Sequence, residues 1–441
     1  MNKKISFNFD ILKEKVCEVL EKWNQSEVIL DEIADWKRIL LFNLNGKHKF
    51  YLSSNGSELR YHDSYEEQAD CTIEISSEHA LQFFNQELNL FEVFGKNQIK
   101  FKGDNSDFLK LTIFFEYFEE DKDLSLLQSE DDWQVGSPED YGMSTSLLDE
   151  SAKKLKIIDI NRNSFLVIKN GVLIYETYYA KKSAEKRKWM PYDVASVTKT
   201  LAALVIGTAV TQGLFTVKDS IHDWIPYVPK GIVPGSQIIH LLTQTSETDP
   251  PGTKFKYNSG EEINTLGTIL SNAANMPSKE FARKVLCDKI GIGKYSWDRI
   301  FKNQKDLPIG YGLKIRPRDA ARLGQLILQK GSWSGEQIIS NDYLEELGSP
   351  SFVDTNSGYG YLVWLNNSLG HWYRPFKNGT GRMIPNAPED LIYASGFFGR
   401  FIFIIPSLNL VIVTFGKKFV WESLDTAQEI YNAIEPALPK K

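Results

Sequence analysis

The stretch Ala195-Ser196-Val197-Thr198-Lys199-Thr200 leads directly into residues 201–210, a segment that is apolar on nearly every face. Such a pattern predicts a helix that is buried on all sides. Ser196 and Lys199 stand three residues apart at its start, and this spacing places both side chains on one side of a helix. Burial and the positive end of the helix both push a lysine toward its neutral form. Because a neutral lysine can take the proton of a serine hydroxyl, the stretch predicts a covalent serine hydrolase.

The same Ser-x-x-Lys spacing occurs twice more, at Ser151/Lys154 and at Ser183/Lys186. Both copies lie in charged sequence, and the second belongs to a basic run over residues 181–188. We expect solvated surface at both places, because a short run of charges usually faces water. Only Ser196 is followed by a segment that predicts a buried helix, so it is the candidate nucleophile.

Composition indicates a globular protein of two or three domains, with 441 residues, 42% of them hydrophobic and 24% charged. A net charge of −6 argues against a nucleic-acid partner. Three widely spaced cysteines predict a reducing compartment and no metal site. The first residues lack the apolar core of a signal peptide, and no apolar run is long enough to span a bilayer. We expect a cytoplasmic protein with no transmembrane segment, a small-molecule substrate and no cofactor.

The sequence divides into two predicted domains joined by a linker. Residues 1–118 alternate helical and strand patterns and read as one small α+β domain. Residues 119–138 are acidic and poor in apolar residues, so we expect the linker there. The elements expected in the first domain are helices over 10–23, 78–85 and 107–118 and strands over 38–45, 49–53, 71–76 and 98–103, with Ser77 as an N-cap.

The second predicted domain covers residues 139–441. It begins with a helix over 146–155 and a hairpin over 164–176, turned by Asn170-Gly171. It ends with strands over 399–406 and 408–415 and a helix over 422–434. Strands at both ends with helices between them predict one antiparallel sheet, built from the two termini of this domain.

Two further segments of the second domain carry candidate chemistry. The turn-forming segment 251–260 contains Tyr257, and a tyrosine near a lysine can relay a proton to a leaving group. The segment 393–400 contains Gly396 and Gly399, which allow close backbone approach, so its amides can complete an oxyanion hole with the amide of Ser196. Each segment alone also fits a structural role. Tyr257 can be a buried tyrosine whose hydroxyl caps a turn, and segment 393–400 can be the bulged start of a strand.

Taken in order, Ser196-x-x-Lys199, Tyr257-Asn-Ser259 and Ala394-Ser-Gly396 resemble the three motifs of the serine β-lactamase and penicillin-binding-protein superfamily. The resemblance is strongest to its class C-like branch of esterases and amide hydrolases, and it covers about residues 131–436. It implies a β-lactamase-like domain with an antiparallel sheet flanked by helices and a helical subdomain.

The same resemblance implies roles for single residues. Ser196 would be the acylated nucleophile, Lys199 the base and Tyr257 an acid and base. The amides of Ser196 and Phe397 would form the oxyanion hole, next to Ser395 and Gly396 of the third motif. His240 would be structural, and the hydrolase would need neither a metal nor an organic cofactor.

The chain also departs from the pattern of that superfamily. The second motif usually has Asn where this chain has Ser259, and the third often begins with Lys or His where this chain has Ala394. The missing cation argues against recognition of a β-lactam carboxylate. The segment 246–250 is short for the superfamily, so residues 370–377 are the candidate for a wall of the pocket. The candidate substrate-binding residues are Ser259, Trp364, Trp372, Tyr373 and Arg374.

The first domain has a resemblance of its own. Residues 69–81 and 91–104 are similar to the sterol carrier protein family, over about residues 10–118. That fold implies an apolar tunnel for acyl chains or sterols, and the alternative is an ordinary core of a small domain. The candidate lining residues are Phe83, Phe84, Leu88, Phe91, Phe94, Phe108, Leu111 and Phe115.

The sequence therefore predicts an α+β protein with a sterol-carrier-like small α/β sheet domain followed by a β-lactamase-like domain. The expected function is hydrolysis of an ester or amide through an acyl-Ser196 intermediate, with an apolar part of the substrate bound by the first domain. Two alternatives stay open: a ligand-binding or lipid-binding protein without turnover on the same fold, and an acyltransferase. The substrate and the oligomeric state are not predicted.

Overall fold

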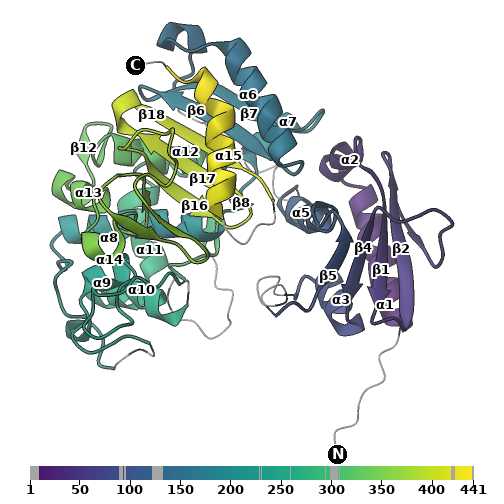
Figure 1. The fold of residues 1–441 in the computed structure, drawn as a ribbon, viewed down its shortest axis with the longest axis horizontal. Helices are drawn as coiled ribbons and strands as arrows, with labels where there is room; N and C mark the ends of the chain where they lie inside the picture. Colours follow the sequence, from purple (N-terminus) through teal and green to yellow (C-terminus); the bar gives the residue numbers. More distant parts are fainter. Residues whose placement is uncertain are drawn as a thin grey trace, which may run out of the picture. The chain divides into compact units, whose positions relative to one another are not determined.

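The computed structural model describes residues 9–88, 93, 96–121, 133–227, 229, 231–258, 260–293, 295–297, 306, 308–418 and 423–439. The chain forms two compact units. Unit 1 spans Met1–Gln128 and Ala180–Met190, and unit 2 spans Ser129–Tyr179 and Pro191–Lys441 (Figure 1). The domain limits expected from the sequence stay a proposal. Unit 1 contains Ala180–Met190, a segment that the sequence pattern assigned to the second domain.

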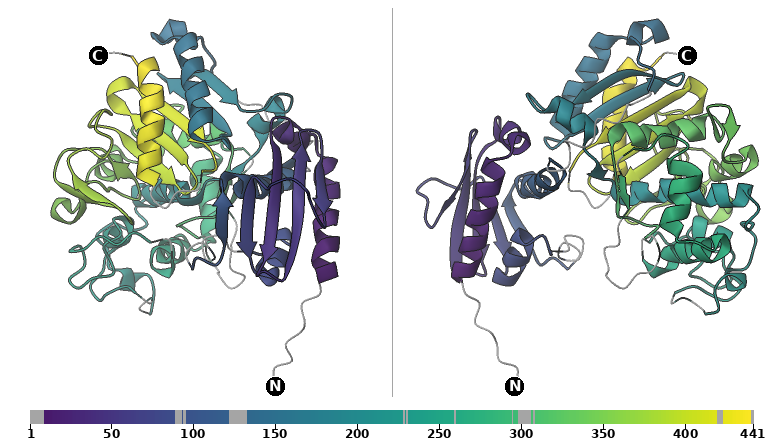
Figure 2. Two further views of the ribbon diagram at one scale, coloured as in Figure 1. Left: turned by 45° about the vertical axis from the view of Figure 1, so that its right-hand side comes forward. Right: turned by 180° about the vertical axis from the view of Figure 1, so that it is seen from behind.

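Unit 1 is a five-stranded sheet with helices on its buried face (Figure 2). The strand order is β3-β2-β1-β4-β5, and β1 and β4 are parallel while the other neighbours are antiparallel. Alternate residues of β4, namely Cys71, Ile73 and Ile75, are buried, so one face of the sheet packs against the helices. The elements are α1 (Phe9–Asn24), α2 (Glu27–Ile33), β1 (Lys37–Leu44), β2 (His48–Asn55), β3 (Leu59–His62), β4 (Cys71–Ile75), α3 (Ser77–Phe84), β5 (Lys100–Gly103), α5 (Ser106–Asp121) and α7 (Ala184–Trp189).

Most elements predicted for this unit are confirmed within a few residues. The sequence pattern missed α2 and β3, which are short. The N-cap of α3 is Ser76 and not Ser77, because the Ser76 hydroxyl accepts the backbone N–H of His79.

The aromatic residues expected to line a tunnel pack against one another. The ring centroids of Phe83 and Phe108 lie 4.7 Å apart, and those of Trp23 and Phe115 also lie 4.7 Å apart. Phe83, Phe84, Phe108 and Leu111 are buried. These rings form the core of unit 1, while Phe91 and Phe94 lie outside the described residues.

The solvated loop predicted over residues 181–188 was wrong for Ser183 and Arg187, which are buried at or in α7, whereas Lys181 and Lys182 are exposed as expected. Arg187 is fully buried and forms an ion pair with Glu32 of α2, and its guanidinium lies 4.8 Å from the ring centroid of Tyr117. Ser183 is buried as well, and its hydroxyl donates to Asp31 over 2.8 Å. The acidic partners lie about 150 residues away in sequence, which local charge patterning cannot detect.

The predicted surface position of Ser151 was also wrong. Ser151 is 1% exposed on α6 (Thr145–Ile158), and its hydroxyl donates to the carbonyl of Leu147 over 2.9 Å. Lys154 is exposed as expected. The serine lies on the apolar stripe of an amphipathic helix, and the lysine lies on its polar face.

Unit 2 contains a six-stranded antiparallel sheet with the order β13-β16-β17-β18-β6-β7. Strands from the start and the end of the unit pair directly, as β18 beside β6, which confirms the sheet predicted from the two termini. Asn170 and Gly171 turn the first hairpin with φ angles of 53° and 80°. The strands are β6 (Ser164–Lys169), β7 (Val172–Tyr178), β13 (Trp364–Leu365), β16 (Ile392–Gly396), β17 (Arg400–Ile405) and β18 (Leu410–Phe415).

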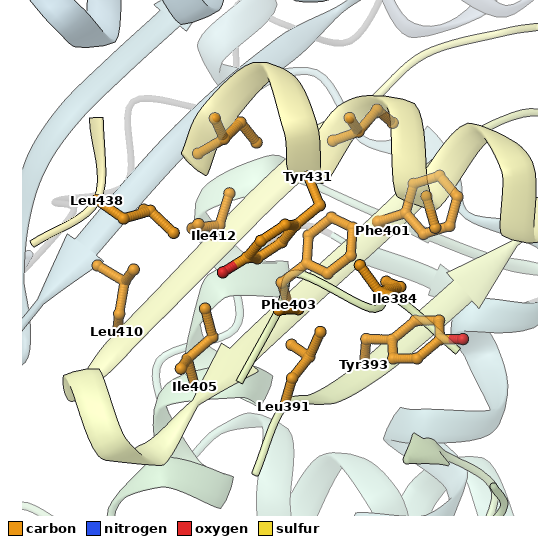
Figure 3. Packing of buried hydrophobic residues seen from close by; sticks show 14 of the residues in the cluster. Ile384, Leu391, Tyr393, Phe401, Phe403, Ile405, Leu410, Ile412, Tyr431 and Leu438 are labelled. Atoms are coloured by element: carbon orange, nitrogen blue, oxygen red, sulfur yellow. The ribbon is translucent and has the colours of Figure 1, made fainter. Parts of the chain in front are cut away.

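Helices cover both faces of this sheet, so β17 and β18 are buried along their whole length. On one face, α6 and α15 (Ser423–Ile434) pack on Phe401, Phe403 and Ile412 (Figure 3). On the other face lies α12 (Pro317–Leu328), where a Cβ added to Gly324 would stand 2.6 Å from Val411. The glycine therefore permits close contact between helix and sheet.

The remaining helices form a subdomain around α8 (Thr198–Thr211), in which every residue from Thr198 to Ala209 is buried. This confirms the all-round burial predicted from the apolar pattern. No helix among the described residues is both long and apolar enough to cross a membrane. The other elements are α9 (Ile238–Leu242), α10 (Glu261–Ala274), α11 (Ser278–Ala282), α13 (Asn341–Leu347), α14 (Val353–Asn356), β8 (Tyr192–Asp193), β9 (Tyr295–Trp297), β10 (Leu313–Ile315), β11 (Ser332–Trp333), β12 (Glu336–Gln337), β14 (His371–Tyr373) and β15 (Asn378–Thr380).

Candidate active site

Ser196 lies in a tight turn that joins β8 to α8. Ala195 has a φ of 46°, an unusual value for a residue other than glycine. Two hydrogen bonds hold this conformation: the Ala195 N–H donates to Asp193 over 2.7 Å, and the Thr198 hydroxyl donates to the Ala195 carbonyl over 2.6 Å. The turn presents Ser196, which is half-buried, at the beginning of the buried helix.

Lys199 lies within hydrogen-bonding distance of the candidate nucleophile. Its Nζ is 3.1 Å from Ser196 Oγ and 3.1 Å from the carbonyl oxygen of Gly310. The side chain is 1% exposed, and this burial lowers the pKa of Lys199 from 10.5 to about 7. A substantial fraction of the amine is therefore neutral at neutral pH and able to accept the proton of Ser196.

Tyr257 lies beside the same amine. Lys199 Nζ is 4.6 Å from the centroid of the Tyr257 ring. That ring stacks on Trp364, with centroids 5.4 Å apart and planes inclined by 26°, and the Arg374 guanidinium lies 3.9 Å from the Trp364 centroid. The three side chains of the predicted catalytic set are thus brought together, although Tyr257 follows Lys199 by more than fifty residues.

The loop that carries Tyr257 is held by side chains of the α9–α10 connection. Gln244 accepts the backbone N–H of Asn258 over 2.5 Å and donates to the hydroxyl of Tyr359 over 2.9 Å. Glu247 accepts the side-chain amide of Asn258 over 2.5 Å. The Asn258 side chain therefore stabilises its own loop, and Ser259, the next candidate residue, lies outside the described residues.

The third motif lies at the end of β16, against the nucleophile turn. A Cβ added to Gly396 would stand 2.4 Å from the carbonyl oxygen of Val194, so a larger residue cannot fit there without movement of the backbone. Ser395 Oγ is 2.8 Å from Ser423 Oγ of α15. The turn that follows β16 contains Phe397, which is half-buried, but its role in an oxyanion hole stays a prediction.

The predicted substrate-binding residues occupy different environments. Trp364 is buried between neighbours of the site, and Arg374 is 8% exposed and donates to Tyr393 and Ser423 over 3.2 and 2.7 Å. Trp372 is 6% exposed, while Tyr373, its neighbour on β14, is 43% exposed. Contact with a substrate stays a prediction for all four.

Gly310 and Asn264 were missed as site residues by sequence reasoning. The Asn264 side chain accepts the backbone N–H groups of Ile309 and Gly310 over 2.8 and 3.4 Å, beside the Gly310 carbonyl that contacts Lys199. Gly310 begins the sequence Gly310-Tyr311-Gly312, and its separation of 111 residues from Lys199 hides the contact from any local pattern.

His240 is buried in α9, and the described residues contain no candidate metal site. The ring of His240 accepts the backbone N–H of Gln237 over 2.9 Å, and burial lowers the pKa of His240. This arrangement fits the structural role implied by the resemblance. Across the part of the chain that the structure describes, no three His, Cys, Asp or Glu residues are grouped so that they could hold a metal ion.

Comparison with known proteins places this geometry in a family. Residues 160–434 match the Beta-lactamase family model, and residues 18–116 match the SCP-2 sterol transfer family model. Among solved structures, a Bacillus anthracis protein assigned as a 6-aminohexanoate-dimer hydrolase is 18% identical, with 71% of this chain and 90% of that chain covered and a TM-score of 0.52. A Bacteroides dorei DSM 17855 protein assigned as a β-lactamase is 16% identical, with 62% and 91% covered and a TM-score of 0.51.

At these identities the two structures show a shared fold. No curated protein gives a significant match. The N-terminal match establishes an SCP-2 region ahead of the larger unit. Because the other family model covers more than half of the sequence, the chain belongs to the beta-lactamase family.

Proposed function

We propose that this protein is a serine hydrolase that cleaves an ester or an amide through an acyl-Ser196 intermediate. The observation that carries the proposal is the 3.1 Å contact between Ser196 Oγ and the Lys199 amine, whose pKa burial lowers to about 7. Family membership supports the same chemistry, since the structurally similar proteins are assigned as hydrolases.

The proposed reaction has two halves. Neutral Lys199 takes the Ser196 hydroxyl proton while Oγ attacks the substrate carbonyl, and the amides of Ser196 and Phe397 stabilise the oxyanion by about 3–4 kcal/mol each. Tyr257 passes the proton to the leaving alcohol or amine, which departs as the acyl-serine forms. Water then attacks the acyl-serine, its proton returns through Tyr257 and Lys199 to Ser196 Oγ, and a carboxylic acid is released.

The proposed substrate has a neutral acyl part rather than a β-lactam carboxylate. Ala394 stands where many members of the superfamily have a cation, so the third motif lacks that charge. The side chains around Tyr257 are aromatic, with Phe255 and Trp364 at centroid distances of 6.4 and 5.4 Å. An aromatic wall of this kind favours an apolar acyl or leaving group.

We also propose that unit 1 binds an apolar part of the substrate, and the SCP-2 match supports this. Its aromatic rings are in mutual contact, so they would have to separate to admit an acyl chain. Titration of the full chain with a fluorescent fatty acid tests this step. Saturable binding that Phe83→Ala weakens supports it, and absence of saturable binding contradicts it.

The catalytic proposal is tested by mass spectrometry of the full chain treated with a fluorophosphonate probe. We expect one adduct, on Ser196, which Ser196→Ala abolishes. Ser151→Ala is the matched control. Ser151 has a lysine at the same spacing, but its hydroxyl donates to the carbonyl of Leu147 in the same helix. A wild-type chain without an adduct on Ser196 would contradict the proposal.

Two assays separate the proposal from the alternatives that the sequence left open. Hydrolysis of a short p-nitrophenyl ester that is lost in Ser196→Ala excludes a binding protein without turnover. Product analysis with an added alcohol separates the hydrolase from an acyltransferase, because a transferase forms a new ester where the hydrolase forms the acid.

A further inference from the structure

Asn264 forms a hydrogen bond with Gly310, the residue whose carbonyl accepts from the Lys199 amine. It lies in the first turn of α10, directly after the loop that carries Tyr257, and is half-buried. Its side-chain oxygen accepts two consecutive backbone N–H groups, from Ile309 over 2.8 Å and from Gly310 over 3.4 Å. Because both donors are backbone amides, the atom facing them is the oxygen and not the nitrogen of the amide.

A continuous series of hydrogen bonds connects Asn264 to the nucleophile. The Gly310 carbonyl is 3.1 Å from Lys199 Nζ, and Lys199 Nζ is 3.1 Å from Ser196 Oγ. The two held N–H groups belong to the peptides that directly precede the Gly310 Cα, so Asn264 anchors the chain up to that atom, and the carbonyl begins the next peptide. Because a glycine has wide conformational freedom, loss of this anchor allows Gly310, and its carbonyl with it, to move away from the amine.

The chemistry of an amine explains why this carbonyl matters. A neutral lysine has two N–H donors and one lone pair, and it acts as a base only when the lone pair faces the serine hydroxyl. A carbonyl that accepts one N–H fixes the rotation of the amine. The Gly310 carbonyl can therefore direct the lone pair toward Ser196 Oγ.

We propose that Asn264 is a positioning residue that holds the Gly310 carbonyl against Lys199 and so orients the amine toward Ser196. The inference rests on the proposed serine hydrolase mechanism. It assigns a function to a residue outside all three motifs, seven positions after Tyr257 in the sequence.

Two substitutions with different expected signatures test this role, with the rate of Ser196 modification by a fluorophosphonate measured against pH. Asn264→Asp keeps an oxygen that accepts both N–H groups but adds a negative charge near the Lys199 ammonium. We expect the midpoint of the pH profile to rise by about 0.5–1 unit, while the limiting rate at high pH stays within about threefold of wild type. Asn264→Ala removes the acceptor, and we expect its limiting rate to fall about 10- to 100-fold without an upward shift of the midpoint.

The matched control is Asn272→Asp on the same helix. Asn272 is exposed and donates to the Trp224 carbonyl over 2.7 Å, so the same charge change is made away from Lys199. We expect the wild-type pH profile for this control. A purely structural role for Asn264 would lower thermal stability in Asn264→Ala and leave its limiting rate within about threefold of wild type.

The outcomes distinguish this inference from the mechanism on which it rests. If the wild-type chain is modified on Ser196 but Asn264→Asp has the wild-type profile, or Asn264→Ala keeps the full limiting rate, the positioning role is wrong and the mechanism stands. If the wild-type chain is not modified on Ser196, the mechanism fails and the positioning role fails with it.

Discussion

Both units of this protein bury lysines, and Lys110 of unit 1 and Lys199 of unit 2 have opposite surroundings. Lys110 of unit 1 is 4% exposed and forms an ion pair with Glu32, which also pairs with Arg187. Lys199 of unit 2 is 1% exposed, and its contacts with Ser196 and Gly310 are to a hydroxyl and a carbonyl, both neutral. A carboxylate offsets the cost of burying an ammonium, whereas neutral partners leave most of that cost in place. The same residue type is therefore structural in one unit and a candidate base in the other.

The largest effect is expected for Lys199→Met, which removes the amine and keeps the length of the side chain. Modification of Ser196 by a fluorophosphonate should fall at least 10³-fold, because no base remains beside the serine. The free energy of unfolding near pH 7 should rise by roughly 1–4 kcal/mol, since the cost of burying the Lys199 ammonium is removed. Labelling rates and urea denaturation of the same preparation measure both changes.

The size of this stability change depends on pH. The folded pKa of Lys199, about 7, lies below its ordinary value of 10.5, so the unfolded chain binds more protons between these two values. The cost of burying Lys199 is therefore largest below pH 7 and disappears as the pH rises toward 10.5. If the stability gained by Lys199→Met grew between pH 7 and pH 10.5, the proposed cost of burying the Lys199 ammonium would be contradicted.

Glu32→Gln should have the largest effect in unit 1. It leaves Arg187 and Lys110 buried without their shared carboxylate, and breaking a buried ion pair costs about 3–5 kcal/mol. Thermal and chemical denaturation of the full chain measure the loss. Glu27→Gln is the control, because its ion pair with Lys186 is exposed and should contribute less than about 0.5 kcal/mol. Equal stability of the two variants would mean that the buried network is not important for this unit.

Tyr257→Phe distinguishes the contribution of the Tyr257 hydroxyl from that of the ring, which lies next to Lys199. The ring keeps its packing against Trp364, so the surroundings of the amine change little. Loss of the hydroxyl should slow hydrolysis of p-nitrophenyl esters about 10²-fold or more, because the proton relay is interrupted. A normal rate in this variant would assign Tyr257 a packing role only, and circular dichroism would verify that the fold is retained.

The smallest effect is expected from pH alone on the wild-type chain. With a pKa of about 7 for Lys199, the rate of Ser196 modification should rise about tenfold per pH unit below pH 6 and level off above pH 8. The rise follows the neutral fraction of the amine. A rate that is independent of pH between 5 and 9 would show that Lys199 is not the titrating base.

The candidate site was predictable where its chemistry follows from local spacing. Ser196 and Lys199 are three residues apart before an apolar run, and the structure places their polar atoms 3.1 Å apart. The proximity of Tyr257 came from the resemblance, since a single tyrosine in an irregular loop carries no local signal. Asn264 and Gly310 could not be found, because their contacts join segments far apart in the sequence.

In the fold as well, features that depend on neighbouring residues were predictable, and features that depend on distant residues were not. Hydrophobic alternation and turn residues predicted most strands of unit 1 and the antiparallel sheet formed by the ends of unit 2, but not β3 or β13. The same reasoning failed at residues 181–188, where a basic run becomes α7 and buries Arg187 in unit 1. The acidic partners on α2, Glu32 and Asp31, lie about 150 residues away, so a local window of sequence cannot detect them.

Sequence by itself indicated most of the helices and strands, the all-round burial of the Ser196 helix and the candidate nucleophile and base, because each depends on residues within one or two helical turns. Tertiary structure decided that Lys110 pairs with the Glu32 carboxylate while Lys199 contacts the Ser196 hydroxyl and the Gly310 carbonyl. The physical reason is that the charge state of a buried amine depends on what surrounds it in space, and those groups come from distant parts of the chain.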